Sequence, residues 1–419
     1  MNHSFIVSAD DLGLTERVTD SILETFDRGA ITSTSILANG EATDYALQEY
    51  QKRHDGLTLA VHLNLTEGKA LLDPKEIPHL VDAHGMFKNS STSLLLTYLF
   101  SSSSRRTELR EQVSRELSAQ WQRIRAEVAV DAANGHQHVH MIPFVFDIVS
   151  ALPGIRYIRI TTEPFYYARG NVRTYIGMHA LTRYAFLFLG HRNRAYAAAR
   201  GIRTNDYLLG FLFSGHMTVD NIAAGFSTLQ KYRAGTVELV FHPGVAERSE
   251  FNRNHANSAW YLSSARTAEK ALLMSEQFRV ILDKAMHASA GNELLDPWRM
   301  VRFLITGILA FLTTLSLLYV LTEWFSLWYL YSATIAYAIS IAVSFAFQKF
   351  WTFQNSISAA ARAQFIRFLF LNIMNIGLNA CGVYLLTELG LWYIASEFFV
   401  ALLIALSSFS IMRRFIFTP

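Results

Sequence analysis

The pattern of hydrophobic and polar residues divides the chain into two halves. Up to about residue 292, short apolar runs alternate with polar and amphipathic stretches, as in a soluble domain. From about Trp298 onward, Phe, Leu, Ile, Tyr and Ala dominate. We therefore predict a soluble domain over residues 1–285, a linker over 286–297 and a membrane domain over 298–419.

The first half has the periodicity of alternating strands and helices. A helix is predicted over Thr15–Arg28, where Gly29 supplies a C-terminal stop. Its apolar residues Val18, Ile22 and Phe26 share one face. Such alternation favours an α/β fold with a parallel sheet or irregular barrel, whose chemistry gathers where the strands end. The strand candidates are Phe5–Ala9, Ser33–Leu37, Thr58–Leu63, Tyr157–Ile160 and Val237–Phe241.

The second half contains four apolar stretches of about 20 residues, the length that a helix needs to cross a bilayer. They are Arg302–Leu321, Leu330–Phe350, Arg367–Thr387 and Trp392–Met412. We predict an all-α, four-helix transmembrane domain. The loops after the first and third stretches carry Glu323 and Glu388, whereas the opposite ends are basic. Because basic ends stay inside, both termini are expected in the cytoplasm, which agrees with the absence of a signal peptide before the first strand.

The membrane half also repeats itself. Arg302-Phe303-Leu304 returns as Arg367-Phe368-Leu369, Leu327-Trp328-Tyr329 returns as Leu391-Trp392-Tyr393, and Phe353 returns as Phe417. Asn372, Asn375 and Asn379 share one face of the third helix, either as contacts between helices or along a substrate path. The paired Arg-Phe-Leu starts, the aromatic-rich end Phe345…Trp351-Thr352-Phe353 and the four-helix size, over roughly Trp298–Phe417, resemble the GtrA family. That resemblance implies a role with polyprenyl-phosphate-linked sugars in cell-envelope glycosylation.

Charge and cysteine content narrow the possibilities further. The formal net charge of +3 and the lack of a long basic run argue against nucleic acid as a partner. The single cysteine, Cys381, excludes an intrachain disulfide. The stretch Ala168–Asn205 contains seven arginines and no acid, so it is either a solvated helix pair or a basic surface for anionic lipid. Asn89–Ser104 is predicted to be a mobile loop near the site, with an apolar segment, Leu94–Phe100, that could touch lipid.

Polar residues with catalytic potential lie where the predicted strands end. The clusters are Asp10 and Asp11, His62, the triplet His136, His138 and His140, and His242. In an extended chain the triplet would share one side, which favours a metal site or a hydrogen-bond network. Two imidazoles and a carboxylate suit a catalytic divalent metal, which lowers the pKa of bound water from about 15.7 toward 7. The Asp pair supplies one carboxylate for the metal and one for a proton.

Five motifs in this order resemble the YdjC-like carbohydrate deacetylases over about Asn2–Leu282. They are Ala9-Asp10-Asp11-Leu12-Gly13, Thr32-Ser33-Thr34-Ser35, His62-Leu63-Asn64-Leu65-Thr66-Glu67-Gly68, His136-Gln137-His138-Val139-His140-Met141-Ile142-Pro143 and Glu238…His242-Pro243-Gly244. The resemblance implies removal of acetyl groups from N-acetylated sugars on an irregular α/β barrel. One departure is Gly135, where the family often has Ser.

The resemblance also implies a role for each matching residue. Asp11, His62 and His136 would bind one divalent metal ion; the ligand set suits zinc, whereas the family is usually described with magnesium. Asp10 would be the general base, and His242 the general acid or a group that stabilises the tetrahedral intermediate. The substrate-binding candidates are His138, His140, Asn64, Arg159 and Glu163, of which Arg159 and Glu163 could instead form a surface ion pair.

Together the two halves lead to a functional hypothesis. The chain deacetylates an N-acetylhexosamine on polyprenyl phosphate at the cytoplasmic face of the bacterial inner membrane, in envelope polysaccharide or lipopolysaccharide modification. Its expected partners are this lipid-linked amino sugar and the inner-membrane lipids, and self-association is left open. One alternative is a deacetylase of free or oligomeric amino sugars with a passive anchor. Another is a flippase for lipid-linked sugars with a sugar-binding domain.

Overall fold

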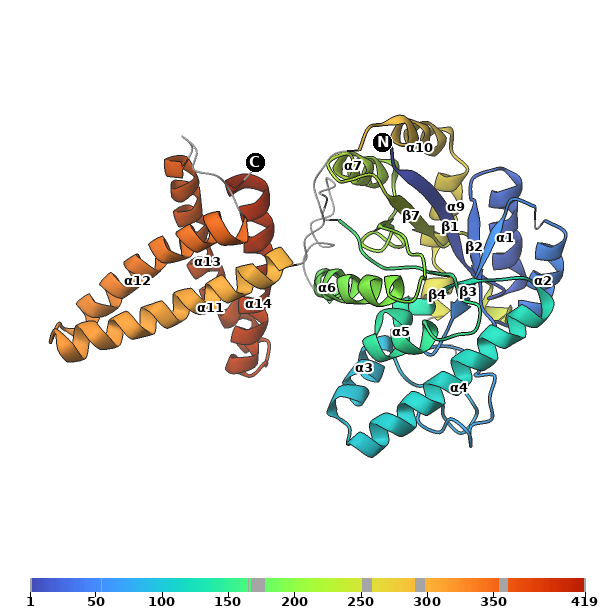
Figure 1. The fold of residues 1–419 in the computed structure, drawn as a ribbon, viewed down its shortest axis with the longest axis horizontal. Helices are drawn as coiled ribbons and strands as arrows, with labels where there is room; N and C mark the ends of the chain where they lie inside the picture. Colours follow the sequence, from blue (N-terminus) through green and yellow to red (C-terminus); the bar gives the residue numbers. More distant parts are fainter. Residues whose placement is uncertain are drawn as a thin grey trace. The chain divides into compact units, whose positions relative to one another are not determined.

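The computed structural model describes residues 2–53, 55–164, 166, 178–250, 258–290, 298–353 and 361–417. The chain divides into two compact units, Met1–Leu295 and Asp296–Pro419. Each unit has an architecture of its own (Figure 1).

The first unit is built on a parallel sheet of seven strands in the order β5-β4-β3-β2-β1-β7-β6 (Figure 1). The strands are β1 (Ser4–Leu12), β2 (Ser33–Ile36), β3 (Thr58–Leu63), β4 (Ala132–Gly135), β5 (Tyr157–Ile158), β6 (Tyr207–Leu209) and β7 (Thr236–Phe241). All five predicted strands are present. The sequence analysis missed β4 and β6, because runs of four and three residues are too short to show a period of two.

The sheet curls until its two edges meet. Tyr157 in β5 pairs with Arg203, which precedes β6, and the amide of Leu208 in β6 donates to the carbonyl of Thr162, which follows β5 (2.9 Å). Between these contacts the side chain of Asn205 bonds both the amide and the carbonyl of Ile160 (2.6 and 2.9 Å). The side chain of Asn205 thus replaces part of the hydrogen-bond ladder between the two edges of the sheet. The predicted irregular α/β barrel is confirmed.

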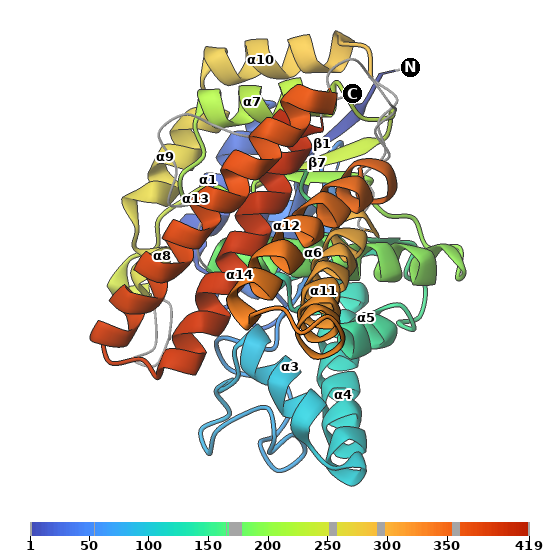
Figure 2. The same ribbon diagram turned by 90° about the vertical axis from the view of Figure 1, so that its left-hand side faces the viewer.

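Helices surround this sheet (Figure 2). They are α1 (Glu16–Asp27), α2 (Thr43–Gln51), α3 (Ser91–Phe100), α4 (Ser103–Glu127), η1 (His136–Met141), α5 (Pro143–Val149), α6 (Met178–Ala198), α7 (Val219–Leu229), η3 (Arg248–Glu250), α8 (Ser258–Tyr261), α9 (Ser264–Leu273) and α10 (Glu276–His287). The predicted first helix is confirmed: Thr15 caps α1 by accepting from the amide of Val18, and Val18 and Ile22 are buried. The predicted loop over Asn89–Ser104 is wrong, because Ser90 and Ser102 cap two helices there.

The second unit consists of four apolar helices, as predicted. They are α11 (Trp298–Tyr319), α12 (Tyr329–Phe347), α13 (Ala361–Glu388) and α14 (Tyr393–Ile411), with π-helical turns η4 (Val320–Trp324), η5 (Gln348–Thr352) and η6 (Met412–Ile416). Within the described residues, three segments are long and apolar enough to cross a membrane: Arg299–Trp324, Tyr329–Thr352 and Ala361–Glu388. Within the described side chains of α14, Ala395–Ile411 is apolar as well but does not reach that length.

The sequence repeat has a counterpart in the structure of this unit. Trp328 and Trp392 precede α12 and α14 with the same backbone conformation (φ −55° and −59°, ψ 130° in both). Both pairs then end in a π-helical turn, followed by Phe353 and Phe417, whose rings stack at 5.1 Å. The unit therefore holds two copies of one helix pair.

The asparagine face of α13 contacts α14. Asn375 donates to Ser408 (2.9 Å), and Asn379 donates to both carboxylate oxygens of Glu397 (3.2 and 3.1 Å). These contacts favour the simpler of the two interpretations, in which polar groups join two helices.

Candidate active site

The carboxyl ends of the parallel strands bring the sequence clusters together. His62 in β3 is paired in register with Asn134 in β4, and Ala9 in β1 lies beside Phe241, the last residue of β7. The register of β1 shifts between Ala9 and Leu12, and Asp11 has a φ of +75°. This bulge lets Asp10 and Asp11, neighbours that would face opposite ways in a regular strand, both reach the site.

Asp11, His62 and His136 form a compact group that could hold a metal ion. Asp11 Oδ1 lies 3.5 Å from His62 Nε2 and 3.3 Å from His136 Nδ1, and these two nitrogens lie 3.2 Å apart. Ligands about 2.1 Å from one ion, at tetrahedral or octahedral angles, are separated by roughly 3.0–3.4 Å. Asp11 Oδ1 is buried and accepts no hydrogen bond. The donor set and its spacing therefore fit one divalent cation.

Neighbouring side chains orient these three ligand atoms. Arg266 Nη1 donates to Asp11 Oδ2 (2.8 Å), which leaves Oδ1 facing the imidazoles. Burial alone would raise the pKa of Asp11, but Arg266 and the two histidines hold it well below its usual range. On the far side of His62, Nδ1 lies 2.6 Å from the side-chain amide of Asn134. This contact holds the ring so that Nε2 faces Asp11.

His136 has its own supporting pair. Its Nε2 lies 3.1 Å from the hydroxyl of Tyr261 and 3.6 Å from Glu67 Oε2, and that hydroxyl also donates to Glu67. Burial alone would lower the pKa of His136, but Asp11 and Glu67 raise it to about 10. The carboxylates therefore make this space favourable for a cation.

Asp10 lies behind the triad in a buried ion-pair network. Both of its oxygens accept from the guanidinium of Arg159 (2.5 and 2.9 Å), which also binds Glu238 through Nε (2.8 Å). Burial alone would raise the pKa of Asp10, but Arg159 outweighs it and lowers the pKa far below the usual range. Arg159 is 1% exposed. The alternative of a surface ion pair with Glu163 is therefore wrong.

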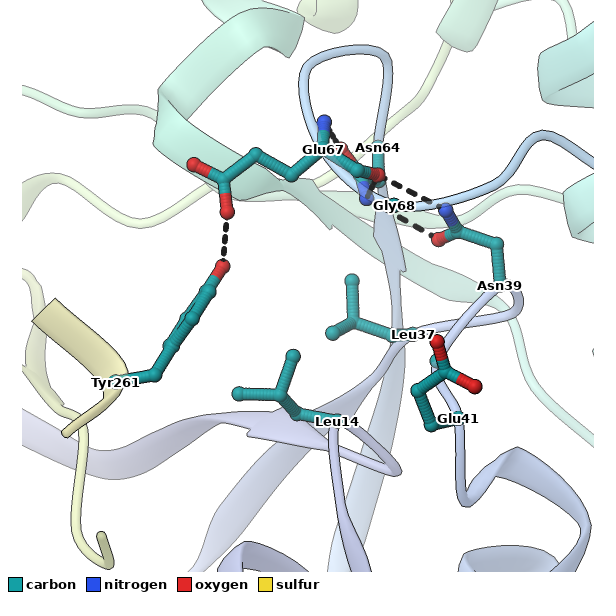
Figure 3. A pocket seen from close by; sticks show the side chains of 9 residues that line it. Leu14, Leu37, Asn39, Glu41, Asn64, Glu67, Gly68 and Tyr261 are labelled. Atoms are coloured by element: carbon teal, nitrogen blue, oxygen red, sulfur yellow. Dashed lines mark hydrogen bonds between the residues drawn. The ribbon is translucent and has the colours of Figure 1, made fainter. Parts of the chain in front are cut away.

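Glu163 and Asn64, both predicted to bind substrate, are engaged with the backbone. Glu163 accepts from the amides of Gly210 and Leu212 (3.0 and 2.6 Å) and so holds the loop after β6. Asn64 accepts from the amide of Glu67 (3.2 Å) and donates to its carbonyl (2.8 Å). Asn64 also lines a pocket that reaches Glu67 and Tyr261 beside the triad (Figure 3). The pocket is lined by Leu14, Leu37, Asn39, Gly40, Glu41, Asn64, Glu67, Gly68 and Tyr261.

The histidine triplet is not extended, so the expected alternation is wrong. Its residues form the short helix η1, in which Gln137 and His138 have positive φ (48° and 54°), and only His136 joins the triad. His138 is half-buried and contacts Thr161 (3.0 Å). His140 Nε2 donates to the carbonyl of Arg159 (2.9 Å), and burial lowers the pKa of His140 to about 3, so it is a neutral structural residue.

Gly135 is explained by this turn. A Cβ atom at residue 135 would lie 2.6 Å from His140 Nδ1 and 2.9 Å from the amide nitrogen of His140. The glycine therefore allows η1 to fold back directly after β4, which brings His136 to the triad.

His242 follows β7 beside Asp10 and has a carboxylate behind it. Its Nδ1 lies 3.7 Å from Glu269 Oε2, which also accepts from the amide of His242 (2.6 Å). Burial alone would raise the pKa of Glu269, but the contacts with His242 lower it. The ring also packs edge-on against Trp260, at 5.8 Å between centroids. His242 is thus a partly exposed imidazole held in one orientation.

Two described arginines of the basic stretch bind other parts of the first unit, whereas Arg200 and Arg203 are exposed. Arg192 binds Asp147 (2.7 Å), and Arg194 bonds the carbonyls of Asn205 and Asp206 (3.2 and 2.9 Å). The contacts of Arg192 and Arg194 favour the first alternative, a helix that extends the barrel, and not the second, a surface that binds lipid. Residues 167–177 and the side chain of Arg183 lie outside the described part of the chain.

Comparison with known proteins agrees with this geometry. The family model described as YdjC-like protein matches residues 4–284. The chain belongs to the YdjC-like family. Carbohydrate deacetylases of Mus musculus and Homo sapiens are 30% and 32% identical to it over 261 and 254 residues, which cover 57% of this chain in both cases and 77% and 74% of the relatives. A chitooligosaccharide deacetylase of Escherichia fergusonii is 33% identical over 156 residues, 36% of this chain and 56% of that relative.

Two further comparisons concern the fold and the membrane half. A crystal structure from Enterococcus faecalis V583, described as a candidate cellobiose-phosphate cleavage protein, superposes with a TM-score of 0.50 at 20% identity, over 70% of this chain and 98% of that one. This likeness shows the fold alone. The family model described as GtrA/DPMS, transmembrane domain, matches residues 302–417. The chain thus joins a YdjC-like barrel to a GtrA-like domain.

The sequence analysis missed three residues that shape the site of this YdjC-like barrel. Arg266 and Glu269 lie on α9, and Tyr261 ends α8, more than 100 residues beyond the histidine triplet. The one available signal was helical spacing, which places Arg266 and Glu269 on the same face as the apolar Leu273. Charged residues on an apolar face need partners, and here those partners are Asp11 and His242.

Proposed function

We propose that the chain is a metal-dependent N-deacetylase that acts on an N-acetylhexosamine carried on polyprenyl phosphate, at the cytoplasmic face of the inner membrane. One observation carries the catalytic part: the buried Asp11 Oδ1 accepts no hydrogen bond and meets two imidazole nitrogens at the separations of metal ligands. The names of the relatives support deacetylation of a carbohydrate as the reaction.

In this proposal Asp11, His62 and His136 hold the ion. A bound divalent ion would supply a nucleophilic water at neutral pH and polarise the acetyl carbonyl. The two imidazoles favour zinc, because magnesium prefers oxygen ligands. Tyr261 and Glu67 keep His136 in place.

Asp10 and His242 handle the protons in this proposal. Arg159 keeps Asp10 ionised at neutral pH and fixes its direction, so Asp10 is always ready to accept a hydrogen bond from water, although the low pKa weakens it as a base. His242, oriented by Glu269, donates a proton to the departing sugar amine. The oxygen of the attacking water bonds to the acetyl carbon while Asp10 takes a proton from that water. The C–N bond then breaks, the sugar nitrogen takes the proton from His242, and acetate and a free amine result.

The lipid-linked substrate is proposed because of the second unit. Three described segments are long and apolar enough to span a bilayer, and this unit matches a GtrA/DPMS transmembrane domain. A deacetylase for a water-soluble oligosaccharide would gain nothing from such helices, whereas a lipid-linked sugar is confined to the membrane.

The test compares two substrates on the purified full chain in lipid. We expect acetate release from a polyprenyl-phosphate N-acetylhexosamine to be much faster than from chitobiose, and Asp10→Asn and His136→Ala to abolish it. Equal rates on both substrates, unchanged when residues 298–419 are deleted, would support the alternative of a passive anchor. Normal function in cells carrying Asp10→Asn and His136→Ala would instead support a flippase with a sugar-binding domain.

A further inference from the structure

The helix α3 presents an apolar face that the barrel does not cover. Leu94 is 1% exposed, and the ring of Tyr98, one turn further, stacks on Phe144 with centroids 4.0 Å apart. The opposite side of the same helix carries Leu96, Leu99 and Phe100, which are 47%, 54% and 85% exposed. Residues 96, 99 and 100 are spaced three and four apart, so they form one continuous outward face.

This exposure is built into the helix. Ser90 and Ser93 form a capping box at the start of α3. Leu94 and Tyr98 attach it to the barrel, and the contact of Tyr98 with Phe144 fixes its rotation about its own axis. Exposing large apolar side chains to water is unfavourable, so a continuous apolar face of this kind indicates a surface that contacts a partner or a membrane.

The residues that follow have the chemistry of a lipid interface. Four consecutive serines, Ser101–Ser104, lead into α4, whose first turns carry the exposed Arg105 and Arg106. Arg105 forms no ion pair within the described residues; Arg106 Nε bonds the carbonyl of Ser101 (3.0 Å). The nearest acid along α4, Glu108, is held by His79 and by Ser104 (3.2 Å each). An apolar tip flanked by arginines suits the boundary between acyl chains and anionic head groups.

We propose that Leu96, Leu99 and Phe100 of α3 dock on the surface of the bilayer that holds the second unit, with Arg105 and Arg106 at its anionic head groups. The occupant is the bilayer because the same chain carries segments able to span it, which keeps lipid at a high local concentration around the barrel. The charge of the two arginines matches an anionic leaflet.

This surface is directly connected to the candidate active site. The hydroxyl of Ser91, at the start of α3, donates to the carbonyl of Gln137 (3.1 Å), the residue after His136. At 1.5 Å per residue, Phe100 lies about 14 Å along the helix from that contact. Docking of α3 would therefore hold the triad within roughly one helix length of the lipid surface.

The test follows single fluorescent labels on the full chain. In a Cys381→Ala background, Ser101→Cys reports on the tip of α3, and Met286→Cys, 41% exposed on α10, is the matched control. Figures 1 and 2 show α10 at the opposite end of this unit from α3. The labelled proteins are placed in vesicles of phosphatidylethanolamine and phosphatidylglycerol that contain phosphatidylcholine spin-labelled on its acyl chain.

We expect the label at residue 101 to be quenched at least about twice as strongly as the label at 286. The quenching should fall to the control level when Leu96, Leu99 and Phe100 are all changed to Asp, a change on exposed positions that leaves Leu94 and Tyr98 intact. It should weaken when phosphatidylglycerol is replaced by phosphatidylcholine.

Equal quenching at residues 101 and 286 would overturn the proposal, and so would quenching at 101 that survives the triple change. If the quenching does not change when phosphatidylglycerol is replaced, the part of the proposal that assigns Arg105 and Arg106 to the anionic head groups is wrong. Because the readout is lipid contact and no substrate is present, the result is independent of the reaction proposed above.

Discussion

Replacing Arg159 by Met tests whether the core of the site is an electrostatic network. Arg159 serves two buried carboxylates, because it binds Asp10 through both Nη atoms and Glu238 through Nε. Methionine retains much of the apolar stem and removes every one of these bonds. Breaking a buried ion pair by removing one partner costs about 3–5 kcal/mol, and two carboxylates lose their partner here, so the upper end of this range is expected.

The dependence on pH separates charge from packing. The pKa of Asp10 is lowered in the folded protein. The ion pair of Asp10 with Arg159 therefore stabilises the folded state fully above the unfolded pKa of about 3.9. This stabilisation is lost as the pH falls below that value and Asp10 becomes protonated. Without Arg159, burial raises the pKa of Asp10 above its usual value. The penalty of Arg159→Met should therefore be largest near pH 8 and shrink as the pH falls toward 5.

The assay is hydrogen exchange on the full chain in detergent, read on peptides from β1 and β7. A penalty of about 3–5 kcal/mol corresponds to a hundred- to several-thousand-fold loss of protection. The matched control is Arg17→Met, because Arg17 and Glu247 form an exposed pair (52% and 57%) that is worth about 0–1 kcal/mol. A loss below about 1 kcal/mol, or the same loss at pH 8 and pH 5, would refute the reasoning.

Three further predictions concern the site. His62→Ala should reduce bound metal, measured by elemental analysis, from one ion per chain to nearly none, and a full complement of metal in the variant would contradict the ligand assignment. Gly135→Ala should cost about 1–3 kcal/mol in thermal unfolding, because the new Cβ would lie 2.6 Å from His140 Nδ1, and an unchanged melting temperature would show that the turn has room. Glu269→Gln should lower kcat for acetate release by about tenfold or more while leaving KM unchanged, since it alters the carboxylate behind His242, and an unaltered kcat would exclude this support.

The order of the motifs along the chain carried most of the ligand prediction. Strands could be located because β1, β3 and β7 are apolar runs with polar residues at their ends, and parallel strands bring those ends to one edge. Asp11 and His62 could be placed at one edge of the sheet on this ground, whereas the grouping of His136 with them rested on the resemblance to the YdjC-like family, because β4 was missed. The division at about residue 298 was equally visible, because lipid demands long apolar stretches.

The ligand candidates and the membrane-type helices could be read from the sequence, because ordered motifs and long apolar stretches are visible in it. The pairing of the charges became visible only in the folded chain. Arg159 meets Asp10 across 149 residues and Arg266 meets Asp11 across 255, and no local pattern encodes such contacts. The same holds for the tight turn that sends His140 away from His136, and for α3, whose outward apolar face exists only because Leu94 and Tyr98 are used against the barrel. Burial and register are properties of the assembled fold, and they distinguish the residues that can bind the metal from those that hold the ligands in place.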